Sequence, residues 1–117
     1  MAETTQLELV TPARVMVRKA AEMVVVPGSE GLFGVLPRHS ALLASLQRGV
    51  VEVYEGGKVI DRIMIDGGLA DVTPEGLTIL AERAVDLSAT SSQELKERAT
   101  KASEVEADFL NSAYEAL

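Results

Sequence analysis

The feature that most constrains this chain is a series of short apolar runs, bounded by turn residues, over its first three quarters. Apolar and acidic side chains alternate at Leu7, Glu8 and Leu9, and again at 51–53. A period of two is typical of a strand with one buried and one wet face. Further apolar runs occupy 15–17, 23–26, 50–54, 59–65 and 77–80. No long helical pattern separates them, so the sequence favours a mainly β fold, an antiparallel sandwich or barrel, over a parallel sheet with crossover helices.

Two turn signals support antiparallel pairing of neighbouring strands. Residues 55–58 are Glu-Gly-Gly-Lys, in which the glycines tolerate positive φ. Residues 73–76 are Thr-Pro-Glu-Gly, in which proline sets φ for a tight turn. We expect the strands on either side of each turn to form a hairpin.

The pattern changes after Leu87, and we expect an N-terminal β domain over 1–87 and a C-terminal helical region over 88–117. Ser91 followed by Glu94 matches a capping box at a helix start. The region forms one helix or two, with a break expected at Asn111-Ser112, and it either docks on the β domain or extends as a mobile arm. The sequence ends at Leu117, and it leaves open whether the helical region is naturally short or truncated. The expected apolar stripe consists of Leu95, Ala99, Ala102, Val105, Phe109, Ala113 and Leu117.

Composition excludes several classes of function. The formal net charge of -7 opposes binding to nucleic acid and to anionic lipid, since both require a cationic surface. Aromatic residues make up 3% of the chain, too few for base-stacking platforms. No apolar stretch approaches the roughly 20 residues that cross a bilayer. We therefore expect no direct membrane insertion, and any membrane association must come through partner proteins.

Few residues in the chain could perform catalysis or bind a metal. Cysteine is absent and His39 is the single histidine, so we expect no metal site and no catalytic residue. A nucleophilic Ser29 or Ser40 acting with His39 is disfavoured, because neighbouring strand residues point to opposite faces. A small hydrolase using His39 and Glu30 is a weak alternative. The glycine-rich segment 28–34 lacks the Gly-Lys-Ser/Thr ending of a phosphate-binding loop. We expect instead a tight surface loop in which Gly28, Gly31 and Gly34 adopt backbone angles closed to other residues.

The segment 27–43, PGSEGLFGVLPRHSALL, resembles the segment that marks epsilon subunits of rotary ATP synthases. In that pattern a G-S-E-G-x-x-G loop is followed by a hydrophobic pair and then by P-x-H-x-x-L. The resemblance continues through Arg48-Gly49-Val50, the Gly67-Gly68 pair and 80–84, LAERA. It covers roughly 6–87 with order and spacing intact.

The resemblance implies a sandwich of about ten strands, followed by helices, at the foot of the central stalk. Such a subunit has no active site of its own. It couples rotation of the proton-driven c-ring to the catalytic head through the gamma subunit, at the cytoplasmic face of the bacterial plasma membrane. By position, His39, Leu42 and Leu43 would lie at the gamma interface, with one leucine facing outward and the other in the core. The loop residues Glu30, Gly31, Leu32 and Phe33 would face the c-ring.

The helical region departs from the family pattern. Acidic residues outnumber basic ones after Leu87, so contact with an acidic surface of the alpha or beta subunits would be partly repulsive, and at most weak regulation of ATP hydrolysis is expected. The family's ATP-sensing motif is matched only at Arg98 and Ala99, and Glu94 and Leu95 break it. No cofactor is expected, and a nucleotide-sensing regulatory module that binds ATP is the alternative function.

Overall fold

The computed structural model describes residues 3–117 and contains eight strands and two helices in that range. The first two residues of the expected β domain lie outside the described part. The strands are β1 (Thr5–Val10), β2 (Val15–Ala21), β3 (Met23–Gly28), β4 (Gly31–Val35), β5 (Leu42–Glu55), β6 (Lys58–Val72), β7 (Gly76–Ala81) and β8 (Ala84–Asp86). The helices are α1 (Ser92–Lys101) and α2 (Glu104–Ala116).

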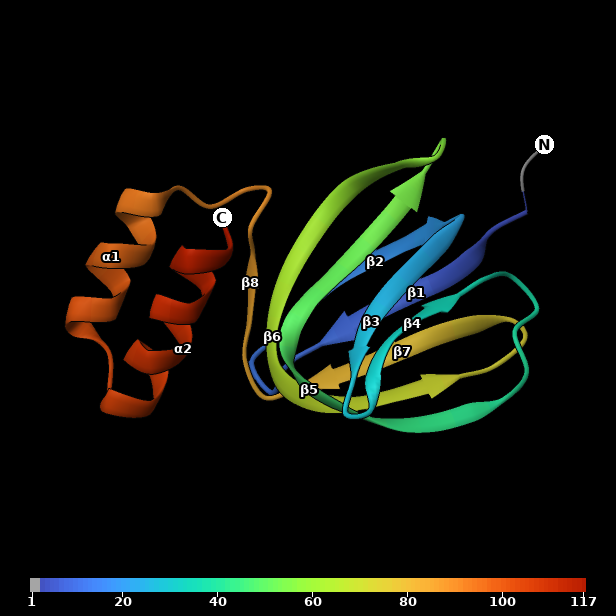
Figure 1. Ribbon diagram of the computed structural model, residues 1–117, viewed down its shortest axis with the longest axis horizontal. Helices are drawn as coiled ribbons and strands as arrows, with labels where there is room; N and C mark the ends of the chain where they lie inside the picture. The colour runs from blue at the N-terminus through green and yellow to red at the C-terminus, as the bar shows by residue number, and fades with distance from the viewer. Residues whose placement is uncertain (1–2) are drawn as a thin grey trace.

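The strands form one folded sheet in the order β2-β1-β7-β6-β5-β3-β4, with β8 paired to β6 (Figure 1). The long strands β5 and β6 bend from one layer of the sandwich into the other. The second half of β6 pairs with β7, while its middle pairs with β8. The expected β-sandwich followed by helices is confirmed, and eight strands are found rather than about ten, because β5 and β6 run unbroken through both layers.

One pair of strands departs from the expected antiparallel pattern. Strands β1 and β7 pair in parallel, with Leu7 opposite Leu77 and Leu9 opposite Ile79. The two strands are far apart in sequence, and no tight turn fixes their relative direction. The two hairpins expected from turn residues do form, since β5 pairs antiparallel with β6, and β6 with β7.

Alternating apolar residues from both layers fill the core of the sandwich. Leu7, Val24, Val51, Ile63 and Ile79 are each fully buried. The core is aliphatic apart from the half-buried Phe33 at its edge. Burial of these side chains is the main stabilising term, at about 1.5–3 kcal/mol each.

The glycine-rich segment is a β-hairpin rather than a surface loop. Strands β3 and β4 pair with Gly28 opposite Gly31, and Gly34 lies within β4. Of the three glycines expected to have special angles, only Gly31 has positive φ, at 131°. Gly28 is required for space instead, because a Cβ there would lie 2.7 Å from the Gly31 carbonyl oxygen.

The helices form an antiparallel pair at one end of the sandwich, beyond β8 (Figure 1). The predicted cap is confirmed, since Ser91 accepts a hydrogen bond from the Glu94 amide. The break falls at Ala102-Ser103 and not at Asn111-Ser112, because Ala102 is extended and Ser103 caps α2 by accepting from the Glu106 amide.

The break also changes which side chains are buried. Val105 and Leu117 of the expected stripe are exposed, whereas Leu110, outside the stripe, is buried. The turn between the helices shifts the buried face of α2 relative to that of α1. A second core joins the helices to the outer face of the sheet, and it consists of Met64, Val85, Leu87, Leu95, Phe109, Leu110 and Ala113.

Candidate docking surfaces

The two leucines expected at a partner interface lie on opposite sides of β5. Leu43 is 69% exposed on the outer face, where it pairs with Asp71 of β6. Leu42 points to the inner side, like Ala44 and Leu46, yet it is 42% exposed because it lies at the open end of the sandwich. The prediction that one of the two fills the core is therefore wrong. The outward-facing leucine is Leu43.

The strand register brings further apolar side chains together on the same outer face. Leu80 pairs with Val10 of β1 on one side and with Leu69 of β6 on the other. Leu69 and Leu80 are 42% and 50% exposed, at strand positions where a solvated face would carry polar residues. We call Val10, Leu43, Leu69 and Leu80 the outer stripe. Val10, Leu69 and Leu80 border a groove of about 480 Å³ that Pro12 and Gly68 also line.

Gly68 allows the strands beneath the outer stripe to approach each other closely. Its φ is 139°, a region open almost only to glycine, and it pairs with Ala81 of β7. A Cβ at this position would overlap the Leu80 carbonyl oxygen and lie 3.1 Å from the Ala81 Cα. The Gly67-Gly68 pair seen in the sequence thus holds β7 against the bend of β6.

The β3–β4 hairpin forms a second exposed surface, built from the residues expected to face the c-ring. Glu30 lies in its turn, and Gly31, Leu32 and Phe33 begin β4. Leu32 is 70% exposed, while Phe33 packs against the core. A groove of about 330 Å³ separates this hairpin from Leu42. Leu42 therefore belongs with this surface and not with the outer stripe.

His39 follows an unusual backbone turn. Arg38 has φ 62°, and its amide donates to the Pro74 carbonyl oxygen at 3.1 Å. The His39 Nδ1 lies 2.7 Å from the Ser40 carbonyl oxygen, so this nitrogen donates and the ring is held beside its own backbone. Within residues 3–117 no hydrogen bond joins His39 to Glu30.

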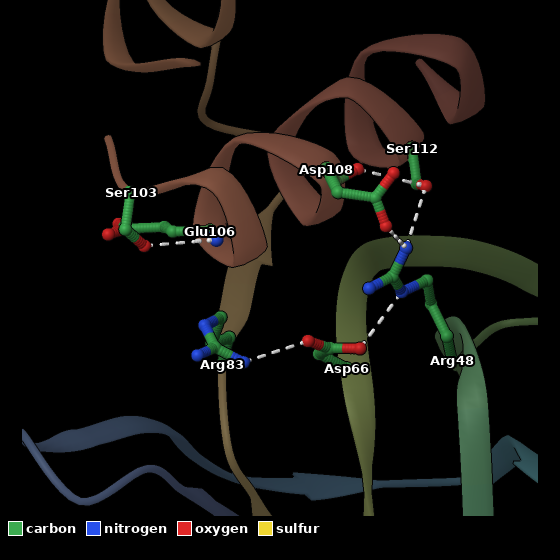
Figure 2. Close-up of polar contacts among 7 residues, drawn as sticks. All are labelled: Arg48, Asp66, Arg83, Ser103, Glu106, Asp108 and Ser112. Atoms are coloured by element: carbon green, nitrogen blue, oxygen red, sulfur yellow. Dashed lines mark hydrogen bonds and ion pairs between the residues drawn. The ribbon is translucent and has the colours of Figure 1, made fainter. Parts of the chain in front are cut away.

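A chain of charged side chains joins the sandwich to α2 (Figure 2). Arg48 of β5 donates from Nε to Asp66 Oδ1 at 2.9 Å and from Nη1 to Asp108 Oδ2 at 2.9 Å and to Ser112 Oγ at 3.1 Å. Arg83 donates to the second oxygen of Asp66 at 3.0 Å. Sequence reasoning missed this chain, because its members are far apart along the sequence.

The environment of Asp66 favours its charged form. Burial by itself raises the pKa of this carboxyl group, but hydrogen bonds and charges from Arg48 and Arg83 outweigh the burial. The pKa of Asp66 is therefore lower than that of a free aspartate. Asp66 thus remains ionised at neutral pH, paired with two guanidinium groups.

The two residues that match the ATP-sensing pattern have different surroundings. Arg98 is exposed at the rim of a groove of about 290 Å³ between the helices and the sandwich, which Arg14 and Arg83 also line. Ala99 packs beside the second core. Leu95 is fully buried there, so it is unavailable to a ligand.

Comparison with known proteins identifies relatives over most of the chain. The family model described as ATP synthase, Delta/Epsilon chain, beta-sandwich domain matches residues 4–87. The chain is 48% identical over 98 residues to an ATP synthase epsilon chain of Rhodospirillum rubrum, covering 84% of this chain and 73% of that relative. It is 40% identical over 103 residues to the epsilon chain of Paramagnetospirillum magneticum, covering 86% and 77%.

Solved structures share the fold. A chain of the Euglena gracilis mitochondrial ATP synthase, in a structure of OSCP, F1 and c-ring, aligns with TM-score 0.68 and 24% identity, covering 96% of this chain and 78% of that one. A chain from the central stalk and c-ring of the Tetrahymena thermophila mitochondrial enzyme aligns with TM-score 0.61 and 13% identity, covering 96% and 97%. Neither helix in the described part of the chain is long and apolar enough to span a membrane.

Proposed function

The chain belongs to the epsilon-chain family of ATP synthase, and from this premise we propose that it is a non-catalytic subunit of the rotor in the central stalk. In this role it joins the gamma subunit to the c-ring and turns with both, so its activity is the transmission of force through fixed contacts. It has no active site of its own. It lies at the cytoplasmic face of the bacterial plasma membrane and is held there by its partners.

The outer stripe is the proposed docking surface for gamma, and it is the observation that carries the proposal. Three exposed apolar side chains, Leu43, Leu69 and Leu80, lie with the half-buried Val10 on adjacent strands, and this arrangement resembles the apolar centre of an interface. Asp71, opposite Leu43, and Glu82, beside the groove, would form its polar rim. Of the three residues expected at the gamma interface, His39, Leu42 and Leu43, the anchor is Leu43. His39 lies near the edge, and Leu42 faces the neighbouring surface.

The β3–β4 hairpin is the proposed contact with the c-ring. Glu30 at its turn offers a charge, and Leu32 beside it offers an exposed apolar group. The turn is held from below, because the Ser29 amide donates to the Ser45 carbonyl oxygen and the Gln47 side-chain amide donates to the Gly28 carbonyl oxygen. A stiff turn of this kind suits a joint that transmits torque.

Binding to gamma tests the proposal directly. Co-expression of the tagged chain with gamma should yield a complex, and Leu80→Arg or Leu43→Arg should abolish it, because a charge would be buried in the apolar centre. Val105→Arg is the matched control, since Val105 is 59% exposed on α2, away from the outer stripe. If the Leu80 and Leu43 variants retain gamma as well as the control does, the outer stripe is not the docking surface.

A nucleotide-sensing role is the second candidate, favoured by the three arginines beside the groove under the helices. An ATP phosphate group could pair with Arg98 and Arg14, and binding there would report to the alpha and beta subunits through the helices. The burial of Leu95 weighs against it. Calorimetric titration with millimolar ATP decides: heat that Arg98→Met removes supports the site, and no heat with the unaltered chain refutes it.

A further inference from the structure

The α1–α2 pair contacts the sandwich mainly through α2. Helix α1 packs on α2, and α2 packs on β6. Within residues 3–117, the polar links between α2 and the sheet come from two arginines, in addition to the apolar second core. Arg62 donates to the Ala116 carbonyl oxygen at the end of the helix, and Arg48 reaches Asp108 and Ser112 near its middle.

The Arg48 guanidinium pairs with the sandwich through Nε and with α2 through Nη1. Its Nε is paired with Asp66, whose side chain is 16% exposed and whose second oxygen is held by Arg83. Its Nη1 is paired with Asp108, whose side chain is 74% exposed. Asp66 belongs to β6 and would stay with the sandwich if α2 moved, so the guanidinium would keep its bond to Asp66 and lose those to Asp108 and Ser112 of α2 (Figure 2).

We propose that Arg48 is a charge-dependent latch that holds the α1–α2 pair on the sandwich, with Asp66 as its positioning residue. Release of the Arg48–Asp108 pair lets both helices leave the sheet as one unit. The sandwich remains folded, because its own core contains only residues of the strands. The latch acts together with the apolar contact, since the Arg48 guanidinium also lies 5.7 Å from the centre of the Phe109 ring.

Hydrogen exchange on the isolated full chain, followed by mass spectrometry, tests the latch without any partner subunit. Arg48→Met keeps an unbranched stem for packing and removes the charge. Exchange in α1 and α2 should accelerate together by about tenfold, the effect expected from losing the partly screened hydrogen bonds to Asp108 and Ser112. Exchange in β1 and β7 should be unchanged. The control is Arg18→Met, which removes an exposed ion pair with Glu8 of β1 that involves neither helix.

Salt and a second variant separate a latch from a general loss of stability. Raising NaCl from about 0.05 to about 0.5 M should accelerate exchange of the helices in the unaltered chain and leave Arg48→Met unaffected. Asp108→Asn, at an exposed site that cannot damage the core, should reproduce the acceleration and add nothing to Arg48→Met. Unchanged exchange in the helices, or equal acceleration in helices and strands, would overturn the proposal.

Discussion

Gly68 offers the sharpest test of how the sheet is built. Replacing it with alanine places a side chain at φ 139° and against the Leu80 carbonyl oxygen. The backbone angle costs about 1–3 kcal/mol, and forcing an extra carbon between paired strands costs about as much again. We therefore expect Gly68→Ala to lower the free energy of unfolding by about 4 kcal/mol, a large part of the stability of a small protein.

Gly56→Ala supplies the matched control. Gly56 also has positive φ, 62°, but no atom lies within 4 Å of the position that its Cβ would occupy. Its replacement should cost only about 1 kcal/mol, the backbone cost alone. In urea unfolding followed by circular dichroism, with a slope of about 1.5 kcal/mol/M, the midpoint should fall by roughly 2.7 M for Gly68→Ala and by roughly 0.7 M for the control. Equal shifts would show that the close approach of β6 and β7 is not what requires glycine.

Three further predictions concern single side chains. Among residues 3–117 the buried Thr5 hydroxyl has no hydrogen-bond partner, so Thr5→Val should raise the free energy of unfolding by about 1 kcal/mol in urea titration; a decrease would indicate a polar partner for this hydroxyl. Arg38 has φ 62°, so Arg38→Gly should raise the thermal midpoint by a few degrees, whereas a lower midpoint would mean that its exposed pair with Glu3 outweighs the backbone strain. Because the pKa of Asp66 is lowered by folding, its stabilising contribution is complete above the unfolded carboxyl pKa of about 3.9 and is lost as pH falls through the lower folded value. The stability difference between the unaltered chain and Asp66→Asn should therefore be constant from pH 7 to about pH 5 and shrink in more acidic solution; a difference independent of pH would contradict this.

The sequence by itself determined the elements that depend on neighbouring residues. Alternation at 7–9 and 51–53, the turn at 55–58 and the cap at Ser91 are local signals, and each predicted the correct element. The motif in 27–43 and the Gly67-Gly68 pair identified the family, because their residue types and spacing are specific. The prediction of special backbone angles in the β3–β4 hairpin was wrong for Gly28. This glycine is required for space, and only the paired strand reveals this.

Only the tertiary structure decided how distant segments meet. The parallel pairing of β1 with β7 puts Val10 beside Leu80, and that register creates the outer stripe. Alternation along β5 puts Leu42 and Leu43 on opposite sides, but only the packing of the β3–β4 hairpin leaves Leu42 exposed at a groove instead of in the core. Arg48 meets Asp108 across 60 residues because α2 folds back on the sheet. Periodicity fixes which face of a strand is buried, but contacts between segments depend on packing of the whole chain, which no local pattern contains.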